Sequence, residues 1–264
     1  MTLSVADYAI IGGTGVYDPA LLEHAREEEV TTRYGAVGCT VGEYQGKRIA
    51  FLPRHGKHHH TPPHQVNYKA NIQALADMGV KHVFATAAVG SMRLALAPGA
   101  LVVVDQFLDF TRGRPLTFFE DGEPVTHVDM TEPYCPRLRR RLVDTAARAG
   151  IAVANGGTYV CTEGPRFESP AEIRMFAQLG GDVVGMTSIP ETVLAKERGL
   201  CYSTVAMATN YCAGMSGAGL SHQEVLDEMA KNVHVLRKLF FDAIAALPFD
   251  ESGCACRIAG GGSL

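Results

Sequence analysis

The stretch Asp182–Asn210, DVVGMTSIPETVLAKERGLCYSTVAMATN, decides the fold of this chain. The apolar pair Val183-Val184 predicts the start of a short buried parallel strand, and the apolar run Leu200–Ala208 predicts a second one. Between them, Ser188-Ile189-Pro190-Glu191 matches a capping box with a proline in the first helical turn. The segment is therefore predicted to form a strand, a turn, a helix and a second strand.

The two ends of this segment predict neighbouring ligand sites. A helix start has unpaired backbone N–H groups and a positive end, so an anion is the natural occupant of the turn at Thr187. The second strand ends in the polar pair Thr209-Asn210, at the carboxyl edge of the sheet, where α/β proteins bind ligands. An anion site and a site for a polar ring are therefore expected side by side.

The composition is that of an ordinary globular protein. The chain has 264 residues, of which 47% are apolar and 20% charged, enough for one large α/β domain with a full core. A net charge of −4 argues against a nucleic-acid partner, and no apolar run approaches membrane-spanning length. The N-terminus lacks a signal-peptide pattern and the seven cysteines are scattered, which together predict a reducing, cytoplasmic location.

Cys254-Ala255-Cys256 is the one close pair of cysteines. No Cys-x-x-Cys pair is present, so no metal site is predicted. The pair is interpreted as two free thiols in a frayed, glycine-rich tail, with a disulfide in the tail as the alternative.

Predicted strands and helices alternate along the chain. The strands cover residues 8–11, 39–44, 47–52, 82–88, 100–108 and 151–161, and the helices cover 66–78, 136–149 and two segments that begin at capping boxes, 169–172 and 221–224. Residues 109–133 are predicted to be a long loop, and loops of that length inside a compact domain are usually functional. The alternation predicts a single α/β domain over residues 1–264, with a core of about 8–246 and a tail of 247–264.

Anion-binding groups follow four different predicted strands. They are Thr14 in a glycine turn, the neighbouring Arg54 and His55, the backbone at Ala87-Ala88, and Thr187. An arginine offers a two-point fork to phosphate, while glycine turns and helix starts offer N–H donors. Each group alone is a weak signal, but the recurrence predicts a phosphate-using α/β enzyme.

Several of these residues have simpler interpretations. Asp18 takes the place of the third glycine of a dinucleotide fingerprint, so the glycine turn fits that motif poorly. The histidines of residues 55–64 have no nearby acidic or cysteine partner and, except for His55, are interpreted as a solvated loop. By position alone, Glu168 would be a carboxylate at a helix start and Asn210 a turn residue.

The chain also resembles the trimeric-type purine nucleoside phosphorylases and the related methylthioadenosine phosphorylases. The resemblance runs from residue 8 to about 246, and the sequence as a whole is most similar to the methylthioadenosine branch. It rests on the segments IGGTGVYDP, FLPRHGKHH with PPHQVNYKANIQAL, ATAAVGSM, VVDQFLDFTRGRP, VTHVDMTEPYCP, CTEGPRFES and VVGMTSIPETVLAKERGLCYSTVAMATNY.

The resemblance implies a central mixed β-sheet flanked by helices and assembly as a trimer or a dimer of trimers. It implies cleavage of a purine nucleoside by inorganic phosphate as co-substrate, with no metal or organic cofactor. The phosphate ligands would be Thr14, Arg54, His55, Ala87, Ala88 and Thr187. The catalytic set would be Asn210, Thr187 and His55, and the substrate-binding set Met186 under the sugar, Phe167 near the base, Glu168, Asn210, Tyr211, Cys212, His222, and His127 reaching a neighbouring subunit.

Three positions depart from the methylthioadenosine pattern. Asn210 stands where the methylthioadenosine branch has an aspartate, and an amide can donate to O6 or N7 of a 6-oxopurine. Glu168 stands where that branch has a small residue, and a carboxylate can accept from N1–H of hypoxanthine or guanine. His222 replaces an apolar residue and suits a 5′-hydroxyl, while Cys212 replaces a second acidic residue.

These positions predict a 6-oxopurine nucleoside phosphorylase that acts on inosine and guanosine in purine salvage. The alternative is a methylthioinosine phosphorylase, which requires His222 to point away from the sugar; methylthioadenosine is the third choice. Two other classes stay open: a nicotinamide oxidoreductase that uses the glycine turn, and a nucleoside-binding module without catalysis.

Overall fold

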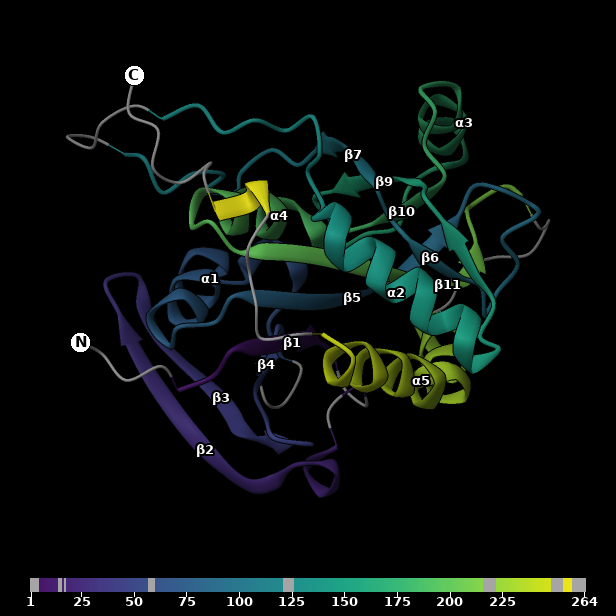
Figure 1. Ribbon diagram of the computed structural model, residues 1–264. Helices are drawn as coiled ribbons and strands as arrows, with labels where there is room; N and C mark the ends of the chain where they lie inside the picture. The colour runs from purple at the N-terminus through teal and green to yellow at the C-terminus, as the bar shows by residue number, and fades with distance from the viewer. Residues whose placement is uncertain are drawn as a thin grey trace.

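The computed structural model describes residues 5–13, 16, 18–56, 60–120, 126–215, 222–247 and 254–257. Strand β5 (His82–Ser91) is the centre of a mixed sheet of eleven strands in this described part (Figure 1). Parallel to β5 lie β1 (Tyr8–Gly12) on one side and β11 (Cys201–Tyr211) on the other. The end of β5 also pairs with β10 (Val183–Gly185) in the antiparallel sense. The predicted α/β domain with a mixed sheet is confirmed.

The other strands extend the sheet from both sides of this centre. On one side, β1 is followed by β4, β3 and β2, and on the other β10 is followed by β9 and β7. On a separate branch, β11 pairs with β6, and β6 pairs with β8. Their bounds are β2 (Glu23–Thr32), β3 (Gly35–Tyr44), β4 (Lys47–Pro53), β6 (Leu101–Val103), β7 (Gln106–Phe110), β8 (Val153–Asn155) and β9 (Thr158–Thr162).

Helices cover both faces of the sheet and enclose two apolar cores. The alternation of side chains along β1 sends Ala9 and Ile11 into one core and Tyr8 and Ile10 into the other. The first core lies under α1 (Tyr68–Asp77) and α4 (Ser188–Glu197), and the second lies under α2 (Pro136–Ala149) and α5 (His222–Ala245) (Figure 1). Helix α3 (Pro170–Gln178) packs beside β9 and β10, and short 3-10 turns span Pro19–Leu21 (η1), Pro63–Gln65 (η2) and Ala255–Arg257 (η3).

One strand was missed by the sequence patterns. Strand β2, EHAREEEVTT, has a mostly exposed run of charged residues in place of the apolar alternation that marks a strand. It is the edge strand of the sheet, where charged side chains protect against pairing with other chains. The hydrogen bonds of its antiparallel pairing with β3 hold β2 in the extended conformation that its own sequence does not predict.

Two predicted strands are each split in two. The segment 100–108 forms β6 and β7, and 151–161 forms β8 and β9. The break in the second lies at Gly156-Gly157, and both φ angles are positive there, at 98° and 158°. The Asp105 carboxylate accepts from the N–H of Gly157 at 2.8 Å, so the two breaks are tied together. In both segments the strand before the break, β6 or β8, belongs to the part of the sheet beside β11. The strand after the break, β7 or β9, belongs to the part beside β10.

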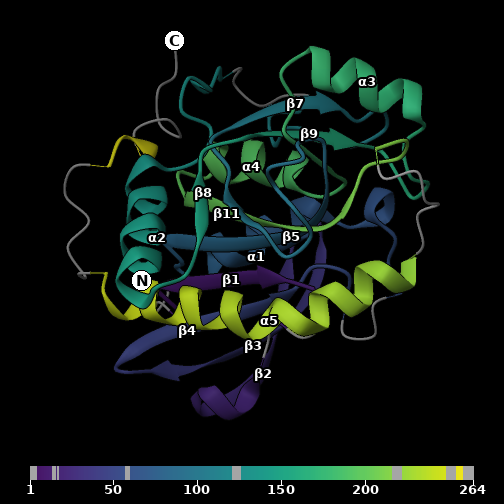
Figure 2. The same ribbon diagram turned by 90° about the vertical axis from the view of Figure 1, so that its right-hand side faces the viewer.

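The register of β5 leaves an opening in the sheet. Strand β1 pairs with β5 as far as Ala85, and β10 pairs with it only from Gly90. Between these two contacts the backbone of residues 86–89 has no partner strand on that side in the described registers. Figure 2 shows the ends of β1, β7 and β9 on the same side of the molecule, toward which the first turn of α5 reaches. This edge is where the predicted ligand groups meet.

The described C-terminal residues are part of the packed structure, contrary to the interpretation of a frayed tail. Cys256, in η3, is only 3% exposed and belongs to the core under α2 and α5. Figure 2 shows η3 beside one end of α2. No described helix combines the length and apolar character needed to cross a membrane.

Candidate active site

A cavity of about 410 Å³ lies at the opening beside β5. This volume is within the range usual for small-molecule sites. Its wall is formed by the ends of five strands, the loop before α3 and the first turns of α5. Among the predicted residues, it is lined by Arg54, His55, Ala87, Ala88, Phe167, Glu168, Met186, Thr187, Asn210 and Cys212. Most of the residues singled out from the sequence therefore line one cavity.

Arg54 follows β4 and is held inside the protein by Glu191. Its Nε and Nη2 donate to the two carboxylate oxygens of Glu191 at 2.5 and 2.9 Å, and its Nη1 donates to the Thr86 carbonyl at 2.8 Å. Burial lowers the pKa of Arg54, but the charge and hydrogen bonds of Glu191 outweigh it and raise the pKa. These bonds use three of the five guanidinium N–H groups, which leaves two for an anion in the cavity.

The carboxylate of Glu191 was expected to close a capping box and does not. Ile189 has extended backbone angles, φ −114° and ψ 126°, so regular helical geometry begins only at Pro190. The Ser188 hydroxyl contacts the hydroxyls of Tyr134 and Thr192 instead. The capping-box prediction at residues 188–191 is wrong because the buried guanidinium of Arg54 takes the carboxylate. The second predicted box, Ser169 with Glu172, is confirmed, and the third, 221–224, lies outside the described side chains.

Thr187 is fixed at the cavity wall by Tyr159. The hydroxyl of Tyr159 accepts a hydrogen bond from the Thr187 N–H at 3.3 Å and also contacts the Thr187 side chain. Gly185 makes this possible, because a Cβ there would collide with the Tyr159 hydroxyl. The side chain of Thr187 caps no helical N–H, and Thr187 lines the cavity.

His55 is oriented by a backbone carbonyl. Its Nδ1 lies 2.8 Å from the carbonyl oxygen of Thr61, which can only accept, so Nδ1 carries the proton. The loop from His60 to Pro63 also lines the cavity. The imidazole ring is therefore held at the same wall as Arg54.

Glu168, which is partly buried, and Cys212, which is buried, lie together at one end of the cavity. The Thr162 hydroxyl donates to a Glu168 carboxylate oxygen at 2.6 Å. Burial raises the pKa of Glu168, although the bond from Thr162 opposes the shift. Burial and the charge of Glu168 raise the pKa of Cys212 to about 12, so Cys212 is a neutral thiol at pH 7.

Asn210 lies at a bulge near the end of β11. The pairing with β5 shifts between Ala208 and Asn210, and the Thr209 hydroxyl donates to the side-chain oxygen Oδ1 of Asn210 at 2.9 Å. The Asn210 amide nitrogen donates to the Tyr211 carbonyl at 2.9 Å, which leaves one of its two N–H groups for a ligand. A Cβ on Gly90 would lie 2.8 Å from the sulfur of Cys212 and 3.4 Å from that amide nitrogen, so a glycine keeps this end open.

Four predicted site residues are not placed in this cavity. Thr14 lies outside the described residues, as does the side chain of His222, whose backbone begins α5. The Tyr211 hydroxyl donates to the Leu94 carbonyl at 3.0 Å, and Tyr211 does not line the cavity. His127 is exposed and also does not line it.

Arg114 is a structural centre of the site that the sequence analysis missed. It is buried, and its Nη1 donates to the carbonyls of Met186 and Ile189 at 2.6 and 2.8 Å. Its Nη2 donates to the carbonyls of Thr162 and Glu163 at 3.2 and 2.7 Å. A single side chain thus joins the turn before α4 to the loop that carries Glu168. Its position in the predicted long loop was the only signal.

Three apolar residues of α5 were also missed. Val225, Leu226 and Met229 line the cavity from the first turns of that helix. They are spaced as one helical face, but the same spacing is typical of ordinary core contacts. Leu226 is 45% exposed and Phe167, in the loop before α3, is 39% exposed, so both apolar side chains are accessible at the cavity.

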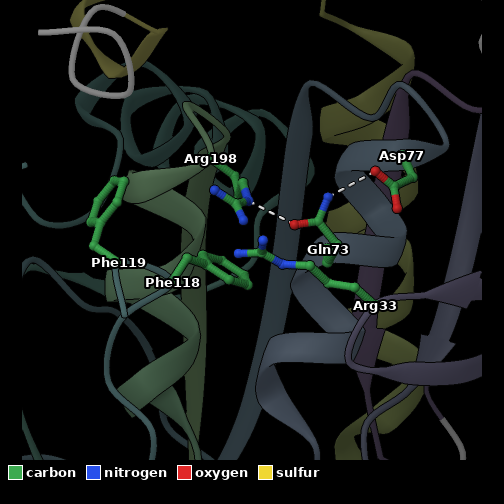
Figure 3. Close-up of a pocket in the computed structure, with 6 residues that line it drawn as sticks. All are labelled: Arg33, Gln73, Asp77, Phe118, Phe119 and Arg198. Carbon is green, nitrogen blue, oxygen red and sulfur yellow. Dashed lines mark hydrogen bonds between the residues drawn. The ribbon is translucent and has the colours of Figure 1, made fainter. Parts of the chain in front are cut away.

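A second cavity, of about 390 Å³, lies between α1, the end of α4 and residues 118–119 (Figure 3). Its polar groups bind one another: Arg198 donates to Gln73 at 2.8 Å, and Gln73 donates to Asp77 at 2.8 Å. The Arg198 guanidinium also covers the Phe118 ring at 3.7 Å. None of the predicted phosphate or substrate residues lines it. The cavity beside β5 is therefore the candidate active site.

Comparison with known proteins agrees with this geometry. Residues 7–245 match the model of the Phosphorylase superfamily. The probable 6-oxopurine nucleoside phosphorylase of Moorella thermoacetica is 56% identical, over 96% of this chain and 97% of that protein. The 6-oxopurine nucleoside phosphorylase of Pyrococcus furiosus is 52% identical, over 94% and 96%.

The fold agrees as well. A crystal structure of a methylthioadenosine phosphorylase from an antarctic soil metagenomic library superimposes with a TM-score of 0.90 and 35% identity. The match covers 97% of this chain and 91% of that one. The chain belongs to the phosphorylase superfamily.

Proposed function

We propose that the chain is a 6-oxopurine nucleoside phosphorylase, which converts inosine or guanosine and inorganic phosphate into the free base and ribose 1-phosphate. The observation that carries the proposal is the base end of the cavity, where Glu168 and Asn210 offer an acceptor and a donor. A 6-oxopurine presents N1–H and O6 to such a pair, whereas adenine N1 is a bare acceptor. The names of the relatives at 52–56% identity support the same base class.

The opposite end suits phosphate. Arg54, with two N–H groups left over, His55 and Thr187 line the same cavity as the open backbone of β5 at Ala87-Ala88. A buried arginine held by a carboxylate keeps its position without reorganising when the anion binds. Thr14 is proposed as a further phosphate ligand.

The proposed reaction needs positioning and electrostatics only. The bond between the sugar and the base breaks toward a ribosyl cation, and the phosphate beneath the sugar stabilises this cation and attacks C1′. The leaving purine gains negative charge, and the free N–H of Asn210 stabilises it at N7 or O6. Inorganic phosphate is the co-substrate, and no metal or organic cofactor takes part in this scheme.

A second candidate differs at the 5′ position. Val225, Leu226 and Met229 give the α5 wall an apolar character that would suit a methylthio group. Methylthioinosine has the same base as inosine, so Glu168 and Asn210 do not distinguish the two. The proposal assigns the 5′-hydroxyl to His222.

Assembly and cellular role are part of the proposal. A trimer or a dimer of trimers would let His127, which is exposed in one chain, reach a neighbouring site. Cleavage of nucleosides in a reducing cytoplasm would serve purine salvage, without a nucleic-acid or membrane partner.

The test is the release of hypoxanthine from inosine with and without phosphate, with ribose 1-phosphate measured in parallel. The proposal predicts equal amounts of base and ribose 1-phosphate, and no release in a phosphate-free sulfate buffer. Release at the same rate without phosphate would identify a hydrolase. Binding of inosine without any cleavage would identify a binding module, and thermal protection by NAD but not by phosphate an oxidoreductase.

A further inference from the structure

Four cysteines from three distant segments meet on the side of the protein where η3 packs. Cys135 is the N-cap residue of α2, Cys201 is the first residue of β11, Cys254 directly precedes η3, and Cys256 lies within it. Their sulfur atoms all lie within 4.8 Å of one another. Cys135 and Cys201 are each 1% exposed, and Cys256 is 3% exposed, so three of the four thiols are closed off from solvent.

The separations fit a tetrahedral ion. The sulfur of Cys254 lies 3.5 Å from that of Cys135 and 3.3 Å from that of Cys201. Zinc–sulfur bonds are about 2.3 Å, which places the sulfurs of a tetrahedral site about 3.8 Å apart. These two separations are a few tenths of an ångström shorter than in such a site, and none of the six separations exceeds 4.8 Å. No other group of three or more potential metal ligands meets in the part of the chain that the structure describes.

The first two ligands are held on rigid elements before any ion binds. The N–H of Cys135 donates to the Tyr202 carbonyl at 2.8 Å, and the N–H of Cys201 donates to the Lys81 carbonyl at 2.9 Å. Cys135 also stands at the N-terminal end of a helix of fourteen residues, where the helix dipole favours a thiolate. The other two ligands are joined in a tight loop, in which the Cys256 backbone hydrogen-bonds to the Cys254 thiol.

We propose that Cys135, Cys201, Cys254 and Cys256 bind one zinc ion that anchors the C-terminal segment to α2 and β11. Binding converts four thiols and one Zn²⁺ into a tetrathiolate complex and releases four protons, and no electron is transferred. Four protein ligands close the coordination sphere, so the ion is structural and takes no part in the proposed phosphorolysis. The spacing rule did not find the site because its ligands are 66 and 53 residues apart in the first two intervals, and only the third interval is short, as a Cys-x-Cys pair.

The primary experiment measures metal in the full-length chain, produced without a histidine tag and purified without chelators. Elemental analysis by mass spectrometry is expected to find one zinc per chain. An organomercurial that modifies thiols is expected to release that zinc to a colorimetric indicator. Less than about 0.1 zinc per chain would overturn the proposal. So would an intact mass lower than that of the thiol form by four hydrogen atoms, which would show two disulfides, or one equivalent of iron in place of zinc.

Matched variants locate the ion. Cys254→Ser, at the most accessible ligand, is expected to lower the zinc content severalfold, whereas Cys39→Ser, in the core of the other face, is expected to keep one equivalent. Zinc retained in full by Cys254→Ser would overturn the assignment. If a variant does not fold, cobalt substitution of the wild-type chain gives the answer instead: four thiolates produce an intense sulfur-to-cobalt charge-transfer band, and its absence contradicts the site.

A second readout follows the anchoring. Removal of the ion with a strong chelator is expected to lower the Tm and to make the chain after α5 sensitive to protease, and added zinc is expected to reverse both changes. Inosine cleavage by the zinc-loaded chain tests the proposed function separately, because the cluster and the cavity share no residue.

Discussion

Arg54 and Glu191 form a buried two-point ion pair across 137 residues of the chain. The arginine is 4% exposed and the glutamate is fully buried. Tyr202 completes the pair by donating its hydroxyl to Glu191 at 2.8 Å. The pair joins the end of β4 to the helix after β10, and so fixes the distance between two walls of the anion pocket.

Replacement of this carboxylate should therefore weaken both stability and phosphate binding. Breaking a buried pair by removing one partner typically costs about 3–5 kcal/mol, because the other charge stays buried and uncompensated. Glu191→Gln is expected to lower the free energy of unfolding by an amount of that order and to raise the KM for phosphate more than that for inosine. Denaturant unfolding and steady-state kinetics measure the two effects.

The matched control is Glu28→Gln, which breaks the exposed pair of Glu28 with Arg26. Exposed pairs contribute about 0–1 kcal/mol, so this variant should keep both properties. Equal losses in the two variants would contradict a special role for the buried pair.

Asn210→Asp should shift the base preference toward adenine nucleosides. The change replaces the remaining amide donor by an acceptor, which faces the 6-amino group of adenine favourably and O6 of hypoxanthine unfavourably. A mismatched buried polar group costs about 1–3 kcal/mol, so the ratio of kcat/KM for inosine to that for adenosine should fall roughly ten- to hundredfold. Asn155→Asp, at an exposed position on β8, is the control. An unchanged ratio would remove Asn210 as the base reader.

Glu168 should give the pH profile of inosine cleavage an acid limb, and this limb should lie at a higher pH than an ordinary glutamate would produce. Burial raises the pKa of Glu168, and the ionised carboxylate accepts from N1–H of the base more strongly than the protonated acid does. Inosine cleavage should therefore fall as the pH drops through this raised pKa. Glu168→Gln should lose about ten- to hundredfold in kcat/KM at neutral pH and should lack the limb. Glu132→Gln, at an exposed position, should keep the wild-type profile; an acid limb that persists in Glu168→Gln would assign it to another group.

His222→Ala should harm inosine cleavage more than methylthioinosine cleavage. A net hydrogen bond contributes about 0.5–1.5 kcal/mol, which predicts a loss of up to about tenfold for the 5′-hydroxyl substrate only. The measurement is kcat/KM for both substrates with each protein. Equal losses would show that His222 does not contact the 5′ position and would favour the apolar wall of α5 as its recognition surface.

The part of the site that the sequence predicted depends on local patterns. Arg54 and Thr187 come just after apolar strands, and Ala87-Ala88 and Asn210 lie in the second half of such strands; the ends of these strands meet at one edge of an α/β sheet. The opening in the sheet beside β5, between Ala85 and Gly90, could not be predicted from local sequence patterns, because it depends on which strands pair with β5.

Long-range partners explain the other errors. Glu191 has the position of a capping residue, and only the fold shows that Arg54 takes its carboxylate. Arg114 binds carbonyls that are 48 to 75 residues away, which no spacing rule registers. Likewise, the four cysteines are brought together by β11, α2 and η3, none of which is near another in sequence.

The most direct measurement compares phosphate-dependent base release from inosine, guanosine, methylthioinosine and methylthioadenosine under the same conditions. The account predicts that kcat/KM is highest for inosine and guanosine and lower by about tenfold or more for methylthioadenosine, because Glu168 and Asn210 read a 6-oxopurine. Dominant cleavage of methylthioadenosine would contradict the account and would mean that the overall likeness to methylthioadenosine phosphorylases describes the substrate better than these residues do.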